Sequence, residues 1–240
     1  MTTNTSLGKL YLIPVTMGES DPMDVLPQTV KRTIELIDHY IVENEKTARK
    51  SIKGVLPEKK QSELVLFALN KHTDAKEHLS FIQPLLAGKN MGLMSEAGCP
   101  GVADPGAVIV KLAHEKGIQV IPLVGPSSIL LAMMASGMNG QSFTFNGYLP
   151  IDKGEKKSAL KNLEKLSFDK NQSQIFIETP YRNNKLLEDI LQALQPTTHL
   201  CIATDITLPT EYIKTLRASD WKKTKVDLHN RPTIFIIHKF

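Results

Sequence analysis

The chain has 240 residues and a formal net charge of +4, and its 41% hydrophobic and 22% charged residues are typical of a soluble globular protein. No apolar run approaches the roughly 18 residues that a membrane helix needs, and no secretory signal opens the chain, so we expect no membrane association. The two cysteines, Cys99 and Cys201, form no CxxC pair, which favours reduced thiols and a cytoplasmic protein.

Short apolar runs alternate with segments of helical period through the first half of the chain. We expect strands over residues 10–13, 40–42, 64–69, 91–94 and 120–124. We expect helices between them, over residues 29–38, 47–53, 75–86 and 107–116. Because the apolar runs lack polar alternation, they suit strands covered on both faces, which predicts a mostly parallel sheet with crossover helices.

Two prolines and a glycine near residues 121–126 mark a change in composition, which predicts a domain boundary that divides the chain into residues 1–124 and 125–240. After it we expect a helix over 129–136, a strand over 142–145 and an exposed polar loop over 150–157. Helices over 158–166 and 184–194 and strands over 174–177, 199–203 and 233–238 would complete a second α/β domain.

Several common motifs are absent from the sequence. There is no GxxxxGK[ST] phosphate loop, no GxGxxG after a strand and no GxSxG nucleophile elbow. No HExxH or cluster of histidine and cysteine at ligand spacing occurs, so we expect no metal site. These absences exclude most of the familiar α/β enzyme classes.

The most informative segment follows the predicted strand at 91–94 and reads Ser-Glu-Ala-Gly-Cys-Pro-Gly-Val-Ala-Asp-Pro-Gly over residues 95–106. Ligands of open α/β sheets bind at the carboxyl ends of the strands, and glycines let the backbone approach a ligand closely. Asp104 and Pro105 are explained without a ligand, as the N-cap and first residue of the next helix. Gly98 and Gly101 are not explained in this way, so the loop as a whole favours ligand binding.

Two further strand ends share this pattern. Residues 122–128 read Pro-Leu-Val-Gly-Pro-Ser-Ser, in which Ser127 or Ser128 could equally cap the following helix. Residues 13–18 read Ile-Pro-Val-Thr-Met-Gly after the first strand and are a weak signal alone.

Taken in order, these motifs and the later Glu178-Thr179-Pro180-Tyr181-Arg182 resemble the tetrapyrrole (corrin/porphyrin) methylase superfamily. Within it the chain is most similar to the branch that contains the 16S ribosomal RNA 2′-O-ribose methyltransferase. The resemblance spans nearly the whole chain. It implies two α/β domains with S-adenosylmethionine in the cleft between them, and a homodimer.

The resemblance also implies the residues that contact the cofactor. Ser127 and Ser128, at a helix start, suit its carboxylate, and Glu96 suits its ammonium group, although an exposed turn carboxylate would look the same. Apolar side chains such as Met17, Val102 and Ile177 suit adenine. The complete expected set is Pro14, Met17, Glu96, Gly98, Cys99, Ser127, Ser128, Ile177, Glu178, Ala203, Pro232 and Thr233.

The acceptor is less well defined, because the chain departs from the ribosomal RNA branch where that branch has Asp-Thr-Arg and Ser-Pro-His-Arg. Here the corresponding residues are 43–46, Glu-Asn-Glu-Lys, and 179–182, Thr-Pro-Tyr-Arg; a third departure lies at 205–211. Tyr181 and Arg182 are the expected substrate contacts, with a surface ion pair as the simpler role for Arg182.

The catalytic base, if one is needed, stays unassigned. A ribose hydroxyl benefits from a positioned carboxylate or tyrosine, for which Glu43, Glu178, Asp205 and Tyr181 are candidates. A basic segment over 217–240 favours an RNA acceptor, but it is also typical of a solvated surface. A tetrapyrrole or other small-molecule acceptor and a non-catalytic cofactor-binding module remain the alternatives.

Overall fold

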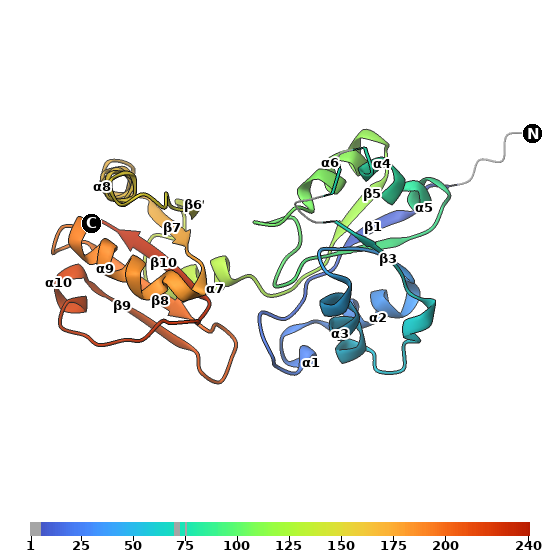
Figure 1. Ribbon diagram of the computed structural model, residues 1–240, viewed down its shortest axis with the longest axis horizontal. Helices are drawn as coiled ribbons and strands as arrows, with labels where there is room; N and C mark the ends of the chain where they lie inside the picture. The colour runs from blue at the N-terminus through green and yellow to red at the C-terminus, as the bar shows by residue number, and fades with distance from the viewer. Residues whose placement is uncertain (1–5, 70–72, 75) are drawn as a thin grey trace, which may run out of the picture. The chain divides into compact units, whose positions relative to one another are not determined.

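The computed structural model describes residues 6–69, 73–74 and 76–240 (Figure 1). The chain divides into two compact units, Met1–Ser127 (unit 1) and Ser128–Phe240 (unit 2). Each unit contains one five-stranded sheet. The two-sheet α/β architecture that the sequence predicts is confirmed.

The sheet of unit 1 is parallel throughout and has the strand order β3-β2-β4-β1-β5. All five predicted strands are confirmed to within two residues at each end. Their bounds are β1 Lys9–Leu12, β2 His39–Val42, β3 Val65–Ala68, β4 Met91–Met94 and β5 Gln119–Pro122.

Helices cover both faces of this sheet (Figure 1). On one face α2 and α3 bury Val30, Ile34 and Ile52 against strand residues such as Tyr40. On the other, α4, α5 and α6 bury side chains such as Ile82 and Ile109 with Leu10 and Met91. The helices of unit 1 are α1 Pro22–Val25, α2 Gln28–Leu36, α3 Glu45–Val55, α4 His78–Phe81, α5 Gln83–Leu86 and α6 Ala107–Glu115, with a short 3₁₀ turn at Gln61–Glu63.

Unit 2 contains a mixed sheet of order β6-β7-β10-β8-β9, in which only the β6–β7 pair is parallel. Helices α8 and α9 pack on the face that carries Phe176 and Phe235. Helix α7 contacts β8, β9 and β10, and Thr215 donates to its Ser136 carbonyl at 2.8 Å. The elements are α7 Ser128–Ser136, β6 Phe143–Tyr148, α8 Lys153–Lys170, β7 Ser173–Ile177, a 3₁₀ turn Pro180–Arg182, α9 Asn183–Ala193, β8 His199–Thr204, β9 Tyr212–Arg217, α10 Ala218–Trp221 and β10 Thr233–His238.

Two expectations for local structure are wrong, and one strand was missed. The helix expected over 75–86 is two short helices, α4 and α5, with Pro84 in the first turn of α5 and Ala75 outside the described residues. The loop expected over 150–157 is helical from Lys153, because Asp152 caps α8 by accepting from the Gly154 and Glu155 N–H groups at 2.8 and 2.9 Å. Strand β9 was not predicted, since its apolar residues are interrupted by Lys214 and Thr215.

Among the residues that the structure describes, we find no helix with the length and apolarity that crossing a bilayer requires.

Candidate cofactor-binding site

Strands β1 and β4 are neighbours whose following helices lie on opposite faces of the unit 1 sheet. The chain leaves β1 towards α2, whereas it leaves β4 towards α6. In open α/β sheets the carboxyl ends at such a switch point are where ligands bind. A ligand site is therefore expected at the segments that follow β1 and β4.

Three loops that the sequence singled out meet at this point. The Val15 N–H donates to the Gly98 carbonyl at 3.0 Å, which joins the loop after β1 to the loop after β4. The Cys99 thiol donates to the Pro126 carbonyl at 3.3 Å, which adds the turn after β5. These contacts connect three segments that are far apart in the sequence.

Two glycines make this convergence possible. A Cβ atom at Gly125 would lie 2.2 Å from Cβ and Cγ of Pro14, so only glycine allows the two segments to approach so closely. Gly98 has a φ of +69°, and a Cβ there would lie 3.3 Å from the Pro126 carbonyl oxygen and 3.9 Å from Met17 Cγ. Pro14, Met17 and Gly98 are thus brought together, as is Cys99.

Asp104 has a different role from the one expected. Helix α6 begins at Ala107, so Asp104 is not its N-cap and Pro105 is not its first residue. Instead the two carboxylate oxygens accept from the Gly101 N–H at 2.8 Å and the Gly106 N–H at 2.6 Å. The side chain closes the loop on itself and fixes its shape, because it satisfies donors at both ends of the turn.

A pocket of about 530 Å³ opens beside these loops, within the range of roughly 300–1,000 Å³ typical of small-molecule sites. Met17, Glu96 and Ala97 line it together with residues of α3. Glu96 accepts from the Thr47 hydroxyl at 3.2 Å, and Lys50 pairs with Glu19 at 2.6 Å on its rim. The α3 contributors were missed by sequence reasoning, because nothing local distinguishes them from any exposed helix face.

Glu43, just beyond β2, lies in a negative environment. Burial, followed by the carboxylates of Glu96 and Asp104, raises the pKa of Glu43 above its ordinary value of 4.5, although the Glu96 N–H opposes this by donating to it. The surroundings of Glu43, one of the four expected proton acceptors, therefore favour its protonated form.

The expected contacts in unit 2 gather on three adjacent strands. Ile177 on β7 and Ala203 on β8 both lie opposite Ile234 of β10. The Thr233 hydroxyl donates to Thr204 Oγ1 at 2.9 Å, and the Pro232 carbonyl accepts from the Asp205 N–H at 3.0 Å.

Glu178 and Arg182 form an ion pair whose carboxylate is almost fully buried. One oxygen of Glu178 accepts from Nε and Nη2 of Arg182 at 3.1 and 2.9 Å, and also from the Thr179 N–H at 2.7 Å. The exposed Tyr181 ring lies 5.3 Å from the guanidinium carbon. The ion pair that was the simpler role for Arg182 is therefore present, and it orients Tyr181 and Arg182 on one short turn.

A second carboxylate in unit 2 is similarly engaged. Asp205 accepts from Nε of Arg231 at 2.8 Å and from the Thr210 hydroxyl at 2.9 Å.

Ser127 directly precedes α7, and Ser128 is its first residue. In the part of the chain that the structure describes, no three histidine, cysteine or acidic side chains are grouped to hold a metal ion.

A parallel sheet with glycine loops at its switch point and a ligand-sized pocket, followed by a mixed sheet, defines a two-unit α/β protein with a candidate small-molecule site. Residues 9–221 match the family model of the tetrapyrrole (corrin/porphyrin) methylases. The chain therefore belongs to this family, and it is a methyltransferase whose methyl donor is S-adenosylmethionine. The predicted family, enzyme class and cofactor are confirmed.

Curated relatives are similar over most of the chain. The ribosomal RNA small subunit methyltransferase I of Escherichia coli O157:H7 is 29% identical over 88% of this chain and 69% of its own length. The protein of the same name from Bacillus subtilis is 32% identical over 79% of this chain and 61% of its own length.

Solved structures share the fold at lower identity. The methyltransferase CobJ has a TM-score of 0.64 at 14% identity, over 97% of this chain and 94% of its own. The uroporphyrin-III C-methyl transferase of Thermus thermophilus, complexed with S-adenyl homocysteine, has a TM-score of 0.58 at 16% identity, over 97% and 98%.

Proposed function

We propose that the protein methylates RNA of the small ribosomal subunit, on a ribose 2′-hydroxyl. The observation that carries the cofactor half of this proposal is the meeting of three strand-end loops at Gly98. The acceptor is supported by the names of the curated relatives, which align with nearly the whole chain.

We place the cofactor against Pro14, Met17, Glu96, Gly98 and Cys99 in unit 1. The residues fit such a molecule: Gly98 leaves the backbone accessible, and the Glu96 carboxylate in the pocket can accept from an ammonium group. Ser127 and Ser128 at the start of α7 suit a carboxylate. The unit 2 residues Ile177, Glu178, Ala203, Pro232 and Thr233 remain predictions from the family resemblance.

When bound, S-adenosylmethionine supplies a methyl group already activated by its sulfonium. The chain's own task is to orient the acceptor hydroxyl, exclude water and receive a proton. We propose Glu43 as the proton acceptor. The oxygens of Glu178 and Asp205 already accept hydrogen bonds from Arg182 and Arg231, whereas the surroundings of Glu43 raise its pKa.

Two measurements test this proposal. Calorimetry with S-adenosylhomocysteine should show binding, and its absence at millimolar ligand would refute the cofactor site. Methyl label from S-adenosylmethionine should then appear in ribosomal RNA when small subunits from a strain that lacks the gene are supplied. Label only in a tetrapyrrole or another small molecule would favour the second candidate acceptor, and binding without transfer would favour a non-catalytic module.

The homodimer that the resemblance implies also stays a prediction. Sedimentation equilibrium of the full chain should give twice the mass of the 26.7 kDa chain. A monomer across the range of working concentrations would contradict it.

A further inference from the structure

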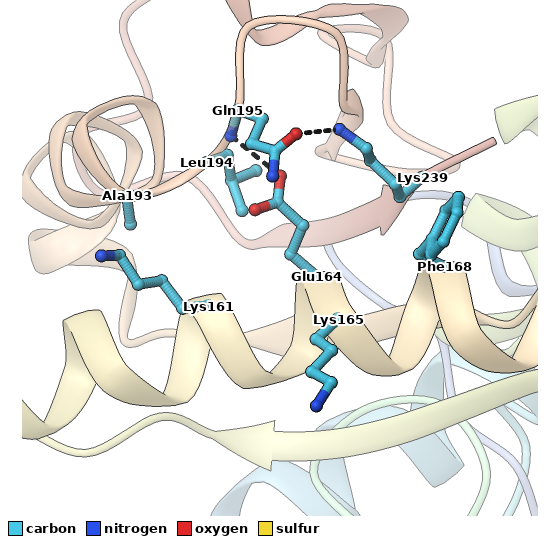
Figure 2. Close-up of a pocket in the computed structure, with 8 residues that line it drawn as sticks. All are labelled: Lys161, Glu164, Lys165, Phe168, Ala193, Leu194, Gln195 and Lys239. Atoms are coloured by element: carbon cyan, nitrogen blue, oxygen red, sulfur yellow. Dashed lines mark hydrogen bonds between the residues drawn. The ribbon is translucent and has the colours of Figure 1, made fainter.

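A second groove, of about 640 Å³, lies on unit 2 between α8 and the segment that follows α9 (Figure 2). Lys161 and Phe168 of α8 line it, opposite Leu194 and Gln195, and Lys239 near the end of the chain completes it. In Figure 2 the Lys161 side chain rises from the helix towards Ala193, and the Phe168 ring lies beside Lys239. The cofactor-binding residues proposed above do not include any of these side chains.

Hydrogen bonds fix the walls of this groove. Glu164, 7% exposed, accepts from the Gln195 N–H at 2.8 Å and from the Thr198 hydroxyl. Lys239 donates to the side-chain oxygen of Gln195 and to the Thr197 hydroxyl at 3.0 Å. Glu164 therefore ties α8 to the opposite wall and turns its carboxylate inward, while Lys239 keeps one of its three donors for a ligand.

Positive charge follows α8 along the groove. Lys157, Lys161 and Lys165 are exposed and spaced four residues apart on α8, with about 6 Å of rise between neighbours, and the last two line the groove. Within the described residues no ion pair includes any of the three. Lys165 extends away from the loop in Figure 2, so the positive charge continues onto the outer side of α8. Repeated, unpaired ammonium groups at this interval suit the successive phosphates of an extended strand.

An aromatic ring stands at the end of this row. Phe168 lies three residues beyond Lys165 and is 60% exposed, which is unusual for a phenylalanine on a charged helix. Ammonium groups for phosphates combined with an exposed ring for a base are what single-stranded nucleic acid requires. We propose that this groove binds a single-stranded segment of the RNA substrate, an inference that rests on the proposed function.

Fluorescence anisotropy with a fluorescein-labelled single-stranded oligouridine of about 12 nucleotides tests the groove directly. The double variant Lys161→Gln/Lys165→Gln should bind about tenfold more weakly at about 0.15 M salt, because each lost phosphate contact removes about 0.7 from the slope of log affinity against log salt. Phe168→Leu should weaken binding about fivefold without changing that slope, since it removes stacking and no charge. The matched control Lys185→Gln/Lys214→Gln removes two exposed charges from the same unit, outside both the groove and the basic segment 217–240, and should bind within twofold of the wild type.

Equal losses in the two double variants would overturn the proposal, because they would show a response to net charge alone. An unchanged affinity of Phe168→Leu, or tighter binding of an RNA duplex than of the single strand, would also overturn it. Methylation of small subunits separates this inference from the proposed function. If the wild type methylates no ribosomal RNA but the groove variants alone lose oligonucleotide affinity, the groove is confirmed as an RNA-binding site and the proposed function is refuted. If methylation proceeds with an unchanged KM in the groove variants, the groove fails.

Discussion

Replacing Gly125 by alanine should damage the cofactor site through a contact that only glycine permits. The added Cβ would lie 2.2 Å from two side-chain carbons of Pro14, whereas carbon atoms in contact sit about 3.5 Å apart, so the turn must move by more than about 1 Å. Overpacking of this kind costs about 1–3 kcal/mol, and this case lies near the upper end because the Pro14 ring is closed onto its own backbone nitrogen and cannot rotate away. The same movement displaces the Pro126 carbonyl, which lies against Gly98 and accepts from Cys99.

Urea unfolding of the full chain and calorimetry with S-adenosylhomocysteine measure the two consequences. We expect the free energy of unfolding to fall by about 2–3 kcal/mol and ligand affinity to fall at least about tenfold. Gly140→Ala is the matched control, because a Cβ there meets no atom within 4 Å and its φ is not positive. Pro14→Gly should partly restore the Gly125→Ala variant, since the next Pro14 atom, Cα, is 3.7 Å away. A Gly125→Ala protein as stable as the control, with unchanged affinity, would refute the reasoning.

Three further changes probe single side chains. Asp104→Ala should lower the free energy of unfolding by about 2 kcal/mol in urea, because two loop N–H groups lose a charged acceptor, and Asp104→Asn should lose less; equal effects would contradict this. Arg182→Ala should lower the free energy of unfolding in urea by about 2 kcal/mol, because it leaves the buried Glu178 carboxylate without its arginine partner. A variant as stable as the wild type would show that Glu178 does not depend on Arg182. The raised pKa of Glu43 means that the folded chain keeps a proton that the unfolded chain loses above about 4.5, so stability falls as the pH rises through the folded pKa. Glu43→Gln should therefore stabilise the protein at about pH 7.5 and not at about pH 4, and an equal effect at both would exclude this assignment.

The parallel sheet was predictable because each of its strands is an unbroken apolar run, and a run of that kind can only be covered on both faces. Helix α8 was predicted five residues too late. Its first turn is polar, and only the cap by Asp152 reveals the start. Strand β9 was missed for a different reason: it is a sheet edge with partly exposed residues and pairs on one side with β8 alone. Its sequence therefore carries no buried-strand pattern.

The candidate site was also predictable only in part. The loops after β1, β4 and β5 converge because of their backbone conformation. Glycine and proline indicate such conformations directly in the sequence. Gly98 and Gly125 could therefore be singled out before their partners were known, although the contact of Gly125 with Pro14 could not. The reading of Asp104 as a helix cap failed because a carboxylate three residues before the first helical residue and one at the N-cap look alike in the sequence.

Several side-chain contacts of unit 2 join elements that are far apart in the sequence. Asp205 is 26 residues from Arg231, and Glu164 is 31 from Gln195, so no local pattern reports either contact. Residues 150–170 show the consequence, since their lysines look like any solvated helix until α8 is seen facing Gln195 and Lys239. The methyl donor could accordingly be inferred from motifs, whereas the acceptor has to be inferred from surfaces. The groove along α8 combines unpaired charge with an exposed ring, and this is why we assign RNA to it.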